Sequence, residues 1–183
     1  MKNDAFTLLE LLVVITIIMV LVGFLVVDFN SARRFQELDI TVQQTLALMD
    51  QSRAKVDSGR VNEDDDYLCL GGYFEVGELP QLVEMEFNAA LGICDINAKE
   101  ESNYGIIQGS AIVESMNLGG EPDKVWAMFV PPEADLVFYN ASGQINDESG
   151  TITMTHSQKE ELSHVLNFST ITNQVTLAED EEE

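Results

Sequence analysis

The feature that most constrains this chain is a long apolar run near its N-terminus, from Phe6 to Val27. Residues Leu11 to Val27 contain no charged side chain. A helix needs about 20 predominantly apolar residues, at a rise of about 1.5 Å each, to cross a bilayer. Helices of soluble proteins are seldom apolar on every side for so long. We therefore expect residues 6–27 to form a transmembrane helix, preceded by a polar leader over residues 1–5.

An ordinary secretory signal does not explain this run. Such signals have an apolar stretch of about 7–15 residues, followed by a cleavage site of small residues. Here the run is longer, carries Glu10 near its start, and ends in the sequence Val26-Val27-Asp28-Phe29. An acid at the centre of a membrane span costs about 2.5–3.5 kcal/mol on insertion scales, so Glu10 is expected to have a function and a partner.

The residues around Glu10 resemble a known signal. The stretch Ala5-Phe6-Thr7-Leu8-Leu9-Glu10-Leu11-Leu12-Val13-Val14-Ile15 is similar to the class III signal of type IV pilins and type II secretion pseudopilins. In that family a prepilin peptidase cuts before the Phe and methylates the new amine. The resemblance therefore implies cleavage between Ala5 and Phe6 and N-methylation of Phe6. The family usually has Gly where this chain has Ala5.

The same resemblance gives Glu10 a role in assembly. After cleavage the Phe6 amine is a cation, and Glu10 is an anion one helical turn away. In a filament, Glu10 of one subunit is expected to pair with the Phe6 amine of a neighbour. A charge pair in a low dielectric fixes register more than it adds stability. The implied partners are other pilin or pseudopilin subunits, the prepilin peptidase, an inner-membrane assembly platform and membrane lipid.

The resemblance also implies a location. It predicts a single pass through the cytoplasmic (inner) membrane, with the C-terminal domain outside the cytoplasm, and a place in a filament after assembly. The positive-inside rule alone favours the opposite orientation, because Arg33 and Arg34 follow the run while only Lys2 precedes it. An inward-facing anchored domain is therefore the alternative.

Past the apolar run, residues 28–57 are predicted to continue as an amphipathic helix. Apolar side chains recur there at helical spacing, at Phe35, Leu38, Val42, Leu46 and Met49. Gly59 is the predicted stop. Residues 58–178 are predicted to be a β-rich domain, and the acid run over 179–183 is predicted to be a disordered tail.

Within the β-rich domain, runs of β-forming residues alternate with Gly and Pro turn signals. Gln81–Leu91 is predicted to be a short helix. The predicted strands are Tyr67–Val76, Tyr104–Val113, Lys124–Val130, Leu136–Asn140, Thr151–Thr155, Leu162–Ser169 and Asn173–Leu177. The expected fold is α+β, with the long N-terminal helix packed on an antiparallel sheet as in pilins. The last strands resemble, more weakly, minor pseudopilins and FimT-like minor pilins.

Composition excludes some functions. The formal net charge is −23, from 32 acids and 9 bases, whereas phosphate binding needs a basic face, so nucleic acid is not an expected partner. No nucleophile elbow or phosphate-binding glycine loop is present in the sequence, so we do not expect an enzyme. His156 and His164 lack the Cys spacing of a zinc site and are expected to be structural or solvated.

Two sets of residues leave alternatives open. Cys69 and Cys94 either form a disulfide, worth roughly 3 kcal/mol for a loop of about 25 residues, or are separate buried thiols. The acidic loop Asn62–Asp66 is either solvated or a weak calcium site at Asp64, Asp65 and Asp66. No other cofactor is expected.

The leading interpretation is therefore a minor pilin or pseudopilin that is processed and joins a filament. The alternative is a membrane-anchored surface binding protein that never polymerises. The sequence does not distinguish a pilus from a secretion or competence filament.

Overall fold

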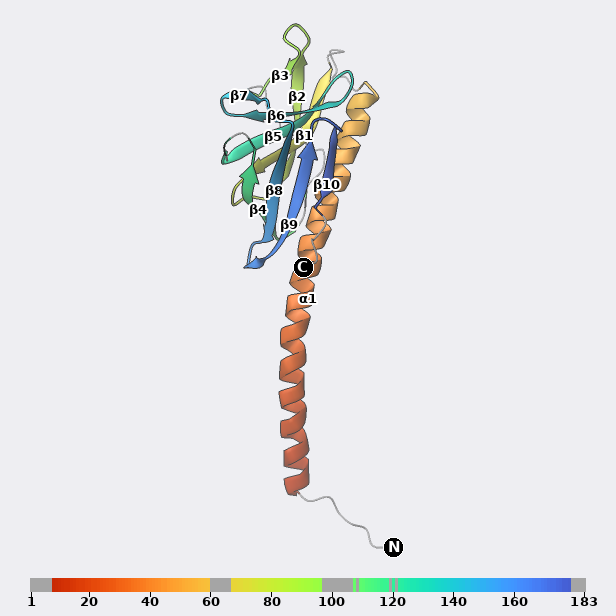
Figure 1. The fold of residues 1–183 in the computed structure, drawn as a ribbon. Coiled ribbons are helices and arrows are strands. Elements are labelled where there is room, and N and C mark those ends of the chain that lie inside the picture. Colours follow the sequence, from red (N-terminus) through yellow and green to blue (C-terminus); the bar gives the residue numbers. More distant parts are fainter. Residues whose placement is uncertain are drawn as a thin grey trace. The chain divides into compact units, whose positions relative to one another are not determined.

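The computed structural model describes residues 8–59, 67–96, 107, 109–118, 120 and 122–178. The chain divides into two compact units, Met1–Gln36 and Glu37–Glu183, and each is described by itself. Over the described residues, one helix is followed by ten strands (Figure 1). The bounds are α1 Leu8–Asp57, β1 Leu68–Glu75, β2 Gln81–Asn88, β3 Ile93–Cys94, β4 Ala111–Asn117, β5 Lys124–Val130, β6 Asp135–Asn140, β7 Gly143–Ile145, β8 Ser149–His156, β9 Lys159–Ser169 and β10 Gln174–Leu177.

Helix α1 ends where the sequence predicts. The Ser58 amide donates to the Ala54 carbonyl (3.1 Å) and the Gly59 amide donates to the Val56 carbonyl (2.9 Å). Gly59 has φ +74°, a conformation that favours glycine, so it closes the last helical turn.

The second unit buries one face of α1. Leu38, Val42 and Met49 are at most 1% exposed, as the apolar stripe predicts, whereas Phe35 in the first unit is 49% exposed. Thr41, Thr45 and Ser52 lie on the same buried face, and their hydroxyls donate to the carbonyls four residues earlier. The helix itself therefore satisfies the polar atoms that it carries into the core.

The strands form two sheets. The six-stranded sheet has the order β3-β2-β1-β5-β6-β7, and the four-stranded sheet has the order β10-β9-β8-β4. Every pair of named strands is antiparallel. An α+β fold with the N-terminal helix packed on antiparallel sheet is thus confirmed.

One hydrophobic core joins the helix to both sheets. It contains Leu38 and Met49 of α1, Phe74 and Phe138 of the six-stranded sheet and Phe168 of the four-stranded sheet. Phe168 meets Phe74 edge to face with ring centroids 5.6 Å apart, a favourable aromatic geometry. The opposite face of the six-stranded sheet carries a second, smaller cluster built around Cys69, Met85, Met128 and Tyr139.

The predicted helix over Gln81–Leu91 is wrong, because Gln81–Asn88 is strand β2. Val83, Met85 and Phe87 alternate toward the second cluster, a period of two that a strand requires and a helix does not. The strand then ends in a turn in which the Asn88 side chain accepts the amides of Ala90 (3.1 Å) and Leu91 (3.2 Å).

Several other boundaries differ from prediction, most of them by one or two residues. The strand predicted over Tyr104–Val113 occupies Ala111–Asn117, and residues 104–106 and 108 lie outside the described residues. Strand β9 begins at Lys159 rather than at Leu162. The short strands β7, which begins at Gly143, and β3 were not predicted.

Candidate functional site

The first unit presents a predominantly apolar surface. Its described side chains from Leu8 to Val22 are exposed, with Leu8 82%, Met19 69% and Leu21 58% exposed. Glu10 lies among them, exposed, in the first turn of α1. A carboxylate is favourable there because the N-terminal end of a helix dipole is positive.

Part of the predicted processing site cannot be located. Ala5 and Phe6 lie outside the described residues, as do Asp64, Asp65 and Asp66 and the tail over 179–183. Within the described ranges, no helix reaches the length and hydropathy that mark a membrane span. The transmembrane segment over 6–27, the cleavage site and the calcium loop therefore stay predictions.

Cys69 of β1 and Cys94 of β3 form a disulfide that closes a 25-residue separation. Both are buried in the second cluster. Tyr139 lies against them from β6, and its hydroxyl accepts the Cys94 amide (3.2 Å). Burial raises the pKa of Tyr139 above its ordinary value of 10.0, against a smaller lowering from this hydrogen bond. The sequence left the pairing of the two cysteines open, because it does not show which strands lie side by side.

A polar cluster lies at one end of the same sheet face. The Tyr73 hydroxyl donates to Glu75, and Lys124 Nζ lies 2.7 Å from Glu75 Oε1. Burial is the main cause that raises the pKa of Tyr73, and the hydrogen bond to Glu75 adds to it. The Tyr73 and Trp126 rings are 5.2 Å apart. Sequence reasoning missed this cluster because only the β1–β5 register brings its members together.

Both histidines face acids of α1. His156 is buried, and its Nδ1 accepts the Gln158 amide (3.1 Å). Its Nε2 therefore carries the proton in the neutral ring and faces Glu37 Oε2 at 3.5 Å. His164 Nε2 lies 3.9 Å from Asp39 Oδ1. His156 thus contacts the helix from β8, and the His164 ring lies near the helix from β9.

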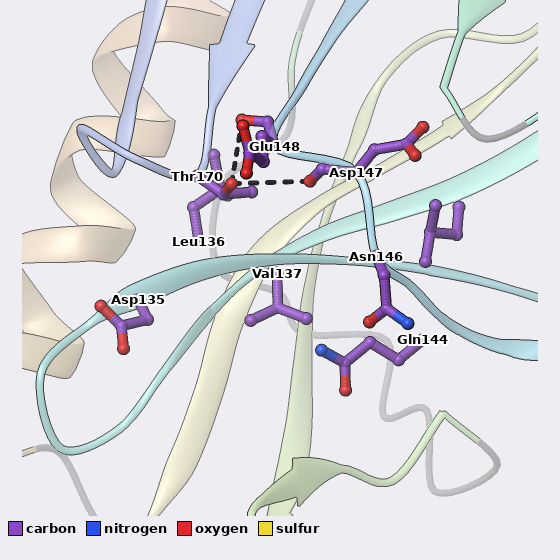
Figure 2. A pocket seen from close by; sticks show the side chains of 9 residues that line it. Asp135, Leu136, Val137, Gln144, Asn146, Asp147, Glu148 and Thr170 are labelled. Carbon is purple, nitrogen blue, oxygen red and sulfur yellow. Dashed lines mark hydrogen bonds between the residues drawn. The ribbon is translucent and has the colours of Figure 1, made fainter.

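A cavity of about 390 Å³ opens where β6 and β7 meet the start of β8. Figure 2 shows its acids: the Asp135 carboxylate lies apart from Asp147 and Glu148. The Thr170 hydroxyl donates to the Glu148 carbonyl (2.9 Å), which ties the cavity wall to β9. Among the described residues, no three His, Cys, Asp or Glu side chains converge as metal ligands. The cavity is therefore not assigned a metal.

The comparisons with known proteins bear on the N-terminus. Residues 1–26 match a family described as the prokaryotic N-terminal methylation motif. No characterised protein and no solved structure matches the chain significantly.

The matched motif is the class III signal of type IV pilins and pseudopilins, so the resemblance to this family is confirmed. Residues 1–26 carry this motif, which implies processing by a prepilin peptidase and association with other pilin subunits. The family that the motif marks is structural rather than enzymatic.

Proposed function

We propose that the protein is a minor pilin or pseudopilin. A prepilin peptidase cuts it between Ala5 and Phe6 and methylates Phe6. Residues 6–27 anchor it in the inner membrane until it enters a filament. The observation that carries the proposal is the methylation motif over residues 1–26.

The exposed surface of α1 supports this function. Apolar side chains from Leu8 to Val22 face solvent on every side of the helix. Each large apolar side chain gains about 1.5–3 kcal/mol when it is fully buried. A surface of this kind is stable only against lipid or against equivalent helices, the two environments that a pilin subunit occupies in turn.

Glu10 then selects the register. Its carboxylate is expected to pair with the methylated amine of Phe6 in a neighbouring subunit. A partnerless charge among packed apolar helices is strongly unfavourable, so a stagger that leaves Glu10 without this partner is rejected.

The test replaces the Glu10 carboxylate with an apolar side chain and leaves the rest of the helix unchanged. In cells with an active prepilin peptidase, Glu10→Val is expected to be processed normally and to be lost from the filament fraction. Thr16→Val is the matched control, because its hydroxyl donates within the helix, to the Val13 carbonyl (2.8 Å). Normal incorporation of Glu10→Val would reject the role of Glu10 in register. Absence of the unaltered chain and of Thr16→Val from the filament fraction would favour the alternative, an anchored binding protein that does not polymerise.

A further inference from the structure

Two triplets of the second unit match the acceptor motif for N-linked glycosylation, which is Asn, any residue but Pro, then Ser or Thr. They are Asn140-Ala141-Ser142 and Asn167-Phe168-Ser169. So short a match has a function only where the folded chain exposes it, in a surface segment of an exported protein. The structure places the two triplets in opposite surroundings.

The first triplet forms the turn between β6 and β7 (Figure 1). Asn140 ends β6 and pairs with Gly143, the first residue of β7, so Ala141 and Ser142 are the two residues of a hairpin loop. Both loop residues are exposed, and Asn140 is half-buried. Exposed loop tips are the places where enzymes most readily reach a folded chain, as proteolytic nicking shows.

A hydrogen bond joins the two residues that the motif requires. The side-chain Oδ1 of Asn140 accepts the Ser142 amide (2.8 Å), which is the arrangement of an Asx turn. The bond holds residue 142 against the Asn140 carboxamide. Within the part of the chain that the structure describes, the Asn140 Nδ2 atom makes no hydrogen bond and is not one of the buried side-chain nitrogens. Solvent therefore reaches the atom to which a sugar would be joined.

The second triplet is fixed inside the four-stranded sheet. Asn167 lies in β9, where it pairs with Thr151 of β8 on one side and with Thr176 of β10 on the other. Phe168, the middle residue, is 1% exposed and belongs to the main core. An enzyme can take up this triplet only after the sheet opens, and opening of core strands costs much of the free energy of unfolding.

We propose that Asn140 is a glycan attachment site. The inference goes beyond the proposed function and does not depend on filament assembly. The Cys69–Cys94 disulfide supports it, because disulfides form and persist in oxidising compartments, where exported domains lie. The co-reactant is a sugar activated as a lipid-linked diphosphate, and a transferase brings the two together.

The reaction joins Asn140 Nδ2 to the anomeric carbon of the sugar. The nitrogen supplies the electron pair of the new C–N bond and loses one proton to a base of the transferase. The bond from the anomeric carbon to the diphosphate oxygen breaks, and the lipid diphosphate leaves with that electron pair. An amide nitrogen is a weak nucleophile, because its electron pair is delocalised into the carbonyl group. A turn that is already formed favours the reaction, since less order has to be imposed on binding.

Peptide mass spectrometry of the full chain, purified from its native cells, tests the proposal. Trypsin cuts after Lys124 and Lys159, and no Lys or Arg follows Lys159, so the two triplets fall on separate peptides, 125–159 and 160–183. Peptide 125–159 is expected to carry a sugar on Asn140, at an occupancy at least about tenfold that of peptide 160–183. An unmodified peptide 125–159, equal occupancy of the two peptides, or a sugar on the Ser142 oxygen instead would each overturn the inference.

Variants of Ser142 separate the motif from the turn. Ser142→Ala removes the hydroxyl that the motif requires but keeps the amide that bonds Asn140 Oδ1, so it is expected to lose the sugar. Ser142→Thr should keep the sugar, and Asn167→Gln, the control in the other triplet, should leave peptide 125–159 modified. A Cys69–Cys94 disulfide in unreduced samples shows that each variant folds. A sugar that persists on Asn140 in Ser142→Ala would overturn the inference.

Discussion

Adding a single methyl group at Gly71 of β1 should cause a large loss of folding stability. β1 lies in the centre of the six-stranded sheet, and a Cβ at Gly71 would lie 2.0 Å from the Ala127 carbonyl oxygen and 2.7 Å from the Met128 Cα. Both atoms are backbone of β5, so no rotamer change relieves the clash. Restoring an ordinary contact of 3.4 Å requires a shift of 3.4 − 2.0 = 1.4 Å between two paired strands.

A shift of that size breaks the flanking hydrogen bonds of the β1–β5 ladder. Each buried backbone group left without a partner costs about 1–3 kcal/mol. Overpacking of a core typically costs about 1–3 kcal/mol. We expect Gly71→Ala to lower the free energy of unfolding by about 3 kcal/mol or more, or to prevent folding.

Gly72→Ala is the matched control. A Cβ there meets side-chain atoms, Phe74 Cε2 at 2.6 Å and Met49 Sδ at 3.1 Å, which can move. Its expected cost is about 1–2 kcal/mol. Urea unfolding, followed by the fluorescence of the single tryptophan, Trp126, measures both variants. A midpoint for Gly71→Ala equal to or above that of Gly72→Ala would refute the reasoning.

The remaining predictions use the same unfolding assay. Replacing both Cys69 and Cys94 by Ala should cost about 3 kcal/mol, and an unchanged midpoint would contradict the closed loop. Asn173→Ala should cost about 1–3 kcal/mol, because the Asn173 side chain accepts the Leu136 amide (2.8 Å) and its φ is +52°; Asn173→Gly, which tolerates that backbone, should cost less. The raised pKa of Tyr139 contributes stability that is fully present below pH about 10 and is lost as pH rises through the folded-state pKa. The free energy of unfolding of Tyr139→Phe should therefore fall less steeply with rising alkaline pH than that of the unaltered chain. Equal falls in the two proteins would exclude this contribution.

Features with a local cause were predictable from the sequence. The burial of Leu38, Val42 and Met49 follows from helical spacing, and the end of α1 follows from Gly59. Strand β5 has the predicted bounds because a β-forming run lies between turn signals there. The methylation motif is also local, because consecutive residues around Glu10 make it up.

Features that depend on strand pairing were not predictable. The apolar residues of Gln81–Leu91 fit a helix until β1 and β3 supply pairing partners on both sides. The Cys69–Cys94 disulfide requires the same pairings.

Mass spectrometry of the mature N-terminus tests the central claim most directly. The chain is purified from a strain with an active prepilin peptidase, and its N-terminal peptide is sequenced and weighed. The account predicts a chain that begins at Phe6 and carries a methyl group on the Phe6 amine. A chain that still begins at Met1 would contradict it.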